Sequence, residues 1–128
     1  MGDSRQLIVV DAANVVGSRA DGWWRDRAGA ARRLLSEIAE LTTRLPESTE
    51  VTVVLEGAAK AAADGAEPTA PRMTVALADR SGDDEIVDVV SQATGAITVV
   101  TADRELRSRV QALGAETVGP GWLVRQLN

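Results

Sequence analysis

The sequence predicts an α/β fold in which a mostly parallel sheet of about five strands is covered by helices on both faces. Short runs of β-branched and aliphatic residues alternate with longer amphipathic stretches, as expected for βαβ crossovers. The runs are apolar without alternation, so both faces of the sheet are expected to be buried. The chain has 128 residues, and we expect residues 1–128 to form a single domain.

The first half of the chain is expected to form two strands with one long helix between them. The strands lie at residues 6–11 and 51–55. Residues 12–24 are expected to form a loop or irregular turn, and residues 25–45 a helix that Pro46 ends. This helix carries an apolar stripe at spacings of three and four, formed by Ala31, Leu34, Ile38, Leu41 and Leu45.

The second half continues the alternation after residues 57–72, an Ala- and Gly-rich segment expected to hold a short helix at 58–63. Ser81 is the candidate N-cap of the helix at 83–93, and Gly114 the candidate C-cap of the helix at 103–113. The last of these helices should bury a stripe of Leu106, Val110 and Leu113. The remaining expected elements are strands at 73–77, 97–101 and 116–118 and a short helix at 120–127.

Composition excludes several kinds of site. The chain has no His and no Cys, which excludes Ser-His-Asp triads, imidazole and thiolate metal ligands, and disulfides. A net charge of −5 argues against a general nucleic-acid coat protein but permits a nuclease whose acids surround a metal ion. We expect a cytoplasmic protein with no membrane partner, because no stretch reads as a signal peptide or a membrane span. The oligomeric state, a homodimer included, is left open.

Acidic residues follow the ends of several apolar runs. They are Asp11, Glu56 and Asp103 after predicted strands, and Asp83 and Asp84 at the start of a predicted helix. Ligands bind beyond the carboxyl ends of parallel strands, so these acids are expected to meet at one sheet edge. Clustered carboxylates repel one another unless a cation such as Mg²⁺ or Mn²⁺ lies between them. Each acid alone could be a helix cap, but their convergence favours a metal site for phosphodiester cleavage, with Asn14 orienting an acid or a water molecule.

Basic and aromatic residues near the same edge are candidates for holding a nucleic acid. The candidates for substrate binding are Arg25, Arg32, Arg104, Thr101 and Trp23, with Arg72 and Arg80 as further arginines on this edge. Arg25 and Arg32 share one helical stripe and could hold a phosphate backbone. The arginines could equally form a solvated helix face, and Thr101 an ordinary strand residue. The Trp23–Trp24 pair could stack on a base or anchor the start of the helix.

Four short motifs occur in order along the chain: VDAAN at 10–14, LEG at 55–57, GDDEI at 82–86 and TADR at 101–104. Together they resemble the NYN domains, bacterial members of the PIN-like nuclease superfamily. The resemblance implies a three-layer α/β/α sandwich with a central parallel sheet. It also implies a Mg²⁺- or Mn²⁺-dependent ribonuclease in which water attacks a phosphodiester, so RNA is the expected partner.

Matching motifs imply specific roles for individual residues. Asp11, Asp83 and Asp103 would be the catalytic, metal-binding acids, with Asp84 as the alternative to Asp83. Asn14 would be an accessory catalytic group and Thr101 a support at the strand end. The superfamily also contains inactive members, so a catalytically inactive RNA- or partner-binding module is the main alternative. A nucleotide phosphohydrolase using the same acids is a less favoured one.

Overall fold

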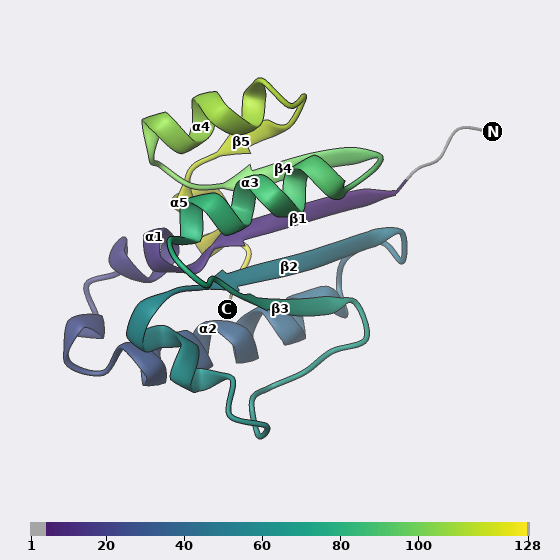
Figure 1. Ribbon diagram of the computed structural model, residues 1–128. Coiled ribbons are helices and arrows are strands. Elements are labelled where there is room, and N and C mark those ends of the chain that lie inside the picture. The colour runs from purple at the N-terminus through teal and green to yellow at the C-terminus, as the bar shows by residue number, and fades with distance from the viewer. Residues whose placement is uncertain (1–4, 128) are drawn as a thin grey trace.

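Five strands form one sheet within residues 5–127, the part of the chain that the computed structural model describes. Every neighbouring pair is parallel. Across the sheet the order is β3 (Met73–Leu77), β2 (Thr49–Leu55), β1 (Gln6–Asp11), β4 (Ala96–Val100) and β5 (Glu116–Val118), as Figure 1 shows. The predicted fold class is therefore confirmed, and β1 is the central strand.

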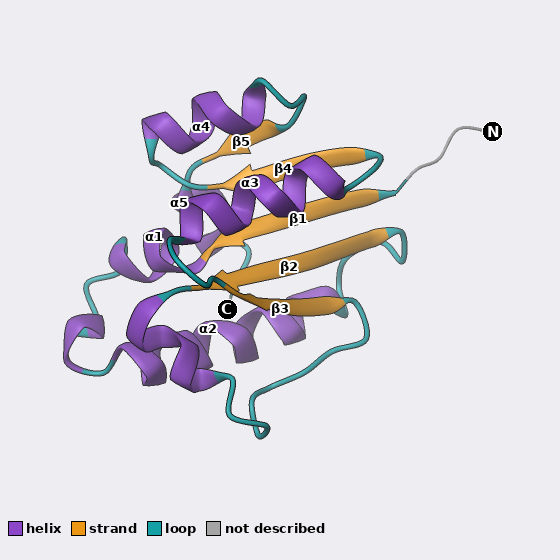
Figure 2. Cartoon of the chain, viewed as in Figure 1, coloured by secondary structure: helices purple, strands orange, loops and turns teal. Residues whose placement is uncertain are grey.

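Helices cover both faces of this sheet (Figure 2). The helices are α1 (Ala12–Gly17), α2 (Arg27–Thr42), α3 (Gly82–Gln92), α4 (Arg104–Gln111) and α5 (Pro120–Val124), with 3-10 turns η1 (Trp23–Arg25) and η2 (Gly57–Ala62). α3 and α4 pack on one face, and α1, α2 and α5 on the other. No helix in residues 5–127 is long and apolar enough to cross a membrane.

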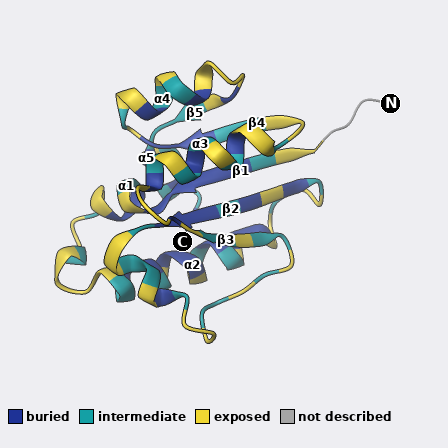
Figure 3. Cartoon of the chain, viewed as in Figure 1, coloured by how far each residue is buried: buried dark blue, intermediate teal, exposed yellow. Residues whose placement is uncertain are grey.

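Each face of the sheet has its own apolar core. Ile8 and Val10 of β1 belong to the core under α2, whereas Val9 belongs to the core under α3 and α4. This division follows from the strand geometry, because successive side chains point to opposite faces. Figure 3 shows burial concentrated in β1, β2 and the sheet-facing sides of the helices. The unbroken apolar run of β1 is explained by its two covered faces.

The helix expected at 25–45 is shorter, Arg27–Thr42, and the one expected at 120–127 ends at Val124. Two further predictions were wrong. The loop expected at residues 12–24 contains α1 and η1 instead. α1 begins at once because Asp11 is its N-cap, and it buries Val15 and Val16. Leu113, expected to be buried, is 47% exposed because α4 ends at Gln111.

Arg72 lies at the opposite edge of the sheet from the one predicted. It directly precedes β3, and its guanidinium donates hydrogen bonds to the carbonyl oxygens of Thr42, Leu45, Pro46 and Thr49. These carbonyls lie at or just after the end of α2 or at the start of β2, where the strands begin rather than end. The prediction placed Arg72 by sequence proximity to a strand, without regard to which end of the strand it precedes. Arg72 therefore has a structural role, joining α2 to the β2–β3 edge.

Replacing Arg72 with methionine should destabilise the fold. Arg72→Met removes a charged donor from several carbonyls, and one hydrogen bond to a charged group contributes roughly 1.5–3 kcal/mol. We expect the free energy of unfolding in urea to fall by at least that amount. Arg80→Met, at an exposed loop position, is the matched control and should change it by less than about 0.5 kcal/mol. Equal stability of the two variants would contradict the role given to Arg72.

Candidate active site

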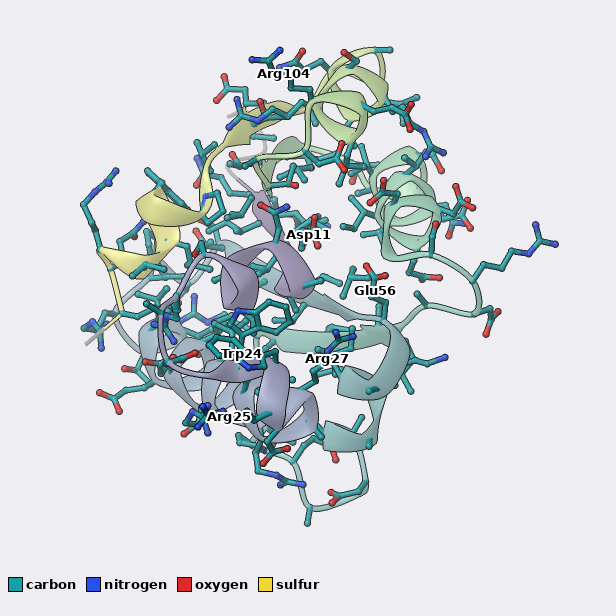
Figure 4. All side chains as sticks on the ribbon, turned by 90° about the vertical axis from the view of Figure 1, so that its left-hand side faces the viewer. Asp11, Trp24, Arg25, Arg27, Glu56 and Arg104 are labelled. Carbon is teal, nitrogen blue, oxygen red and sulfur yellow. The ribbon has the colours of Figure 1, made fainter. Side chains whose placement is uncertain are left out.

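The carboxyl ends of β1, β2 and β4 meet beside the start of α3 and bring four acids to one edge of the sheet. Asp11 ends β1, Glu56 follows β2, Asp103 follows β4 and Asp83 lies in the first turn of α3. Figure 4 looks onto this edge and shows Asp11 near its centre, with Glu56 close by. Electrostatic coupling links Asp11 to Asp83 and Glu56, and Asp83 to Asp103 and Glu56.

Asp11 is a buried carboxylate that accepts two hydrogen bonds. It is 5% exposed. Its Oδ2 accepts a hydrogen bond from Oγ1 of Thr101 at 2.9 Å, and its Oδ1 accepts one from the backbone N–H of Asn14 at 3.4 Å. Its pKa is raised from 3.8 to about 6, chiefly because of burial; the two hydrogen bonds oppose this shift, and Asp83 and Glu56 add to it. Asp11 therefore carries its charge at neutral pH at a cost in folding free energy.

Thr101 and Asn14 hold the β4–α4 loop against the end of β1. The hydroxyl oxygen of Thr101 also accepts a hydrogen bond from the N–H of Asp103 at 3.1 Å. Oδ1 of Asn14 accepts one from the N–H of Ala102 at 2.8 Å. Thr101 is fully buried, so its hydroxyl bonds an acid rather than facing solvent. Both functions of this hydroxyl, donor and acceptor, are therefore used within the protein.

Asp83 faces the other acids, whereas Asp84 points to an arginine. The pKa of Asp83 is raised by burial, then by Asp103 and Glu56, and Arg109 lowers it. Asp84 instead forms a 3.1 Å ion pair with Arg109 of α4 and is exposed. Ser81 is the N-cap as predicted, since its Oγ accepts a hydrogen bond from the N–H of Asp84 at 3.2 Å, although α3 begins at Gly82, one residue before the expected start. Asp83 is therefore the acid of this pair that joins the cluster.

Glu56 reaches the cluster by lying over a glycine. Its Oε1 occupies the place that a Cβ on Gly82 would take. Gly82 is buried at the start of α3, so a larger residue there would displace the Glu56 carboxylate. The glycine of the GDDEI motif thus gives Glu56 its position beside Asp83.

The donor chemistry of the cluster suits a hard divalent cation. All its candidate ligands are carboxylate oxygens, which Mg²⁺ and Mn²⁺ prefer. The pKa values of Asp11 and Asp83 are raised chiefly by burial and further by the neighbouring acids, and a bound cation would counter both effects. Within residues 5–127, however, no three acidic side chains are arranged to hold an ion. The acids are near enough to affect one another's pKa, but their side chains are not arranged to coordinate one ion together.

The arginine rim predicted for the substrate is only partly available. Arg32 forms a 2.7 Å ion pair with Asp64 and donates a hydrogen bond to the carbonyl of Ala66 at 3.1 Å, which ties α2 to the segment after η2. Arg25 lies over the ring of Trp24. Arg104 is exposed at the start of α4, on the far side of Asp11 from Arg25 (Figure 4). The candidate arginines therefore do not form one continuous stripe.

A pocket of about 210 Å³ adjoins the acid cluster, and it contains a residue that the sequence interpretation did not single out. Arg27 lines it together with Trp23 and Glu56. The guanidinium of Arg27 lies 5.5 Å from the centre of the Trp23 ring. Ala31 lies one helical turn after Arg27 and also lines the pocket. That spacing of four, which begins three residues after the tryptophan pair, is the sequence signal by which Arg27 could have been found.

Comparison with known proteins supports the fold. No family model matches the sequence, and neither does any curated protein. Among solved structures, the chain is similar to Rae1 (YacP) from Bacillus subtilis, in the crystal structure of its W164L mutant. The TM-score is 0.74 at 19% sequence identity, over 94% of this chain and 74% of that one. The chain therefore shares the fold of that protein, an α/β architecture with a parallel central sheet.

Replacing Asp11 with asparagine should stabilise the protein at neutral pH. The pKa of Asp11 is raised to about 6 in the folded state, so the folded protein loses stability when this carboxyl ionises. Relative to its value below pH 4, the free energy of unfolding therefore falls as the pH rises through 6. The shift corresponds to roughly 3 kcal/mol, at about 1.4 kcal/mol per factor of ten in the ionisation constant. Asparagine keeps the helix cap.

Urea unfolding from pH 3.5 to 8 should show Asp11→Asn more stable than the wild type above pH 6 and equally stable near pH 3.5. Parallel profiles would contradict the assignment, and Asp88→Asn, at an exposed position of α3, should give the wild-type profile.

Removing the Thr101 hydroxyl should raise the pKa of Asp11 above about 6, since the hydrogen bond from Thr101 favours the charged carboxylate. The measurement is a carbon-13 NMR titration of the Asp11 carboxyl in Thr101→Val. Thr98→Val, on the same strand but not bonded to Asp11, is the control. A pKa of Asp11 that is unchanged or lower in Thr101→Val would show that the hydroxyl does not support this acid.

Proposed function

We propose that this protein is a Mg²⁺- or Mn²⁺-dependent ribonuclease that hydrolyses phosphodiester bonds in RNA. The observation that carries the proposal is Asp11, buried at the end of the central strand, with its pKa raised to about 6 beside Asp83 and Glu56. Burying a charged carboxylate among other carboxylates is unfavourable unless a cation compensates. The fold shared with Rae1 and the NYN-like motifs are the reason for proposing RNA phosphodiester hydrolysis rather than another metal-dependent reaction.

In this proposal each acid has a defined part. Asp11, Asp83 and Asp103 would hold the ion, with Glu56 as a further oxygen donor. When bound, the ion supplies a lowered pKa for water and neutralises charge on the phosphate oxygens. Thr101 orients Asp11, and the amide oxygen of Asn14 fixes the loop that carries Asp103.

A catalytically inactive RNA- or partner-binding module is the second candidate. It is favoured by the arrangement of the acids, no three of which stand ready to hold an ion within the described residues. It is disfavoured by the arginines on which it would depend. Arg19 and Arg32 form ion pairs with Glu37 and Asp64, so these two arginines are already engaged within the protein.

Metal binding and cleavage should depend on the same acids. We expect calorimetry to detect Mn²⁺ binding by the wild type, and Asp11→Asn, Asp83→Asn and Asp103→Asn to weaken it. Cleavage of labelled single-stranded RNA should require Mg²⁺ or Mn²⁺, stop in EDTA and fall by roughly a hundredfold or more in each variant. Even residues that only support metal ligands commonly affect affinity by 10–100-fold. Asp88→Asn, at an exposed position on the same helix as Asp83, is the matched control.

The outcomes separate the candidate functions. RNA binding without cleavage under any divalent ion would favour the inactive module. Hydrolysis of nucleoside triphosphates with no effect on RNA would indicate a nucleotide phosphohydrolase. Mn²⁺ binding that is equal in the wild type and all three variants would remove the metal site from this edge of the sheet.

A further inference from the structure

The pocket beside the acid cluster has one aromatic wall and walls of small aliphatic residues. It lies between α1, the η1–α2 segment and η2. Trp23 forms the aromatic wall, and the ring is held in place by packing against the core on that face of the sheet. Val16, Ala31 and Ala59 line the rest. Small side chains around a fixed ring leave a space suited to a flat group.

The volume of the pocket limits what it can take. At about 210 Å³, it is smaller than the roughly 300–1,000 Å³ of pockets that enclose drug-sized ligands. A single ring system is therefore a better match than a whole dinucleotide or a peptide segment. An aromatic occupant could stack on Trp23, as bases stack on aromatic side chains in proteins that bind single-stranded nucleic acids.

Two charged residues of opposite sign complete the lining. Arg27 lies over the Trp23 ring and is exposed, so its guanidinium can meet a phosphate at the pocket entrance. Glu56 has a carboxylate that can only accept hydrogen bonds when ionised, as it would from the N–H groups of a base. Figure 4 shows Glu56 between Asp11 and Arg27. The pocket and the acid cluster thus share Glu56 as a common wall.

We propose that this pocket receives one unstacked base of single-stranded RNA, with Arg27 holding an adjoining phosphate. The inference rests on the proposed function and names the form of its substrate. The base stacks on Trp23, and the sugar–phosphate chain then passes beside Glu56 toward Asp11 and Asp83. A base paired within a duplex must first leave its stack to enter such a pocket, so the protein selects single-stranded segments.

The test measures RNA binding in EDTA, where no cleavage takes place. Fluorescence anisotropy would follow a labelled single-stranded oligoribonucleotide, the same chain with abasic sites throughout, and the corresponding duplex. Ala59→Leu fills the pocket from η2, and Ala58→Leu is its control, because Ala58 is exposed and outside the lining. Arg27→Gln is compared with Arg33→Gln, an equal charge change at an exposed position of α2 that is also outside the lining.

We expect Ala59→Leu to weaken binding of the normal oligonucleotide by about 5- to 150-fold, the range for loss of one stacked base. Ala58→Leu should bind as the wild type does. The abasic chain and the duplex should bind the wild type more weakly by a similar factor, and Ala59→Leu should no longer distinguish normal from abasic RNA. Arg27→Gln, unlike Arg33→Gln, should reduce the slope of log binding constant against log salt concentration by about one, the change expected for loss of a single phosphate contact.

The proposal is overturned if the wild type binds normal and abasic chains equally, or if RNA does not bind measurably. It is also overturned if a folded Ala59→Leu binds as Ala58→Leu does. Should Ala59→Leu fail to fold by circular dichroism, the abasic comparison on the wild type decides alone. Cleavage that depends on Asp11 but persists with unchanged RNA affinity in Ala59→Leu would reject the pocket and keep the nuclease. Binding that depends on the bases but is not accompanied by cleavage would reject the nuclease and keep the pocket.

Discussion

The hydrogen bond from the Thr101 hydroxyl to the Asp11 carboxylate joins the two strands around which the site is arranged. β1 is the central strand, and its last residue is a buried acid that is stable there because it has donors from Thr101 and the start of α1. The same hydroxyl accepts the N–H of Asp103 and so sets the start of α4. One threonine therefore contacts two of the acids and links the end of β1 to the start of α4.

The acids are held together by packing and helix caps rather than by attraction to one another. Asp11 caps α1, Asp103 caps α4 and Asp83 lies in the first turn of α3, each favourable next to a helix N-terminus. Those local gains offset part of the burial and the repulsion that together raise the pKa of Asp11 and Asp83. Gly82 adds the space that Glu56 occupies. Structural caps and candidate metal ligands are thus the same residues, and the two interpretations of each acid are compatible.

The strands and the edge at which the acids meet could be predicted from sequence because both depend on local pattern. An unbroken apolar run followed by an acid, as at Asp11, fixes a buried strand and the end from which the acid projects. The failures have equally physical causes. α1 is too short to show a helical period and depends on its cap, Asp11. Arg32 bonds Asp64, a residue 32 positions away, and the sequence gives no sign of that pairing.

The internal pairing of arginines has a consequence for how the site would recognise RNA. Arg32 holds the chain after η2 against α2, and this fixes the η2 wall of the pocket, to which Ala59 belongs. An arginine expected to hold phosphate thus shapes a cavity instead. With a net charge of −5, general attraction to a phosphate backbone contributes little. Affinity must then come from contacts that act at short range, such as stacking on Trp23, together with the single charge of Arg27. In the proposed ribonuclease, a base in the pocket would therefore determine where along the RNA the acids act.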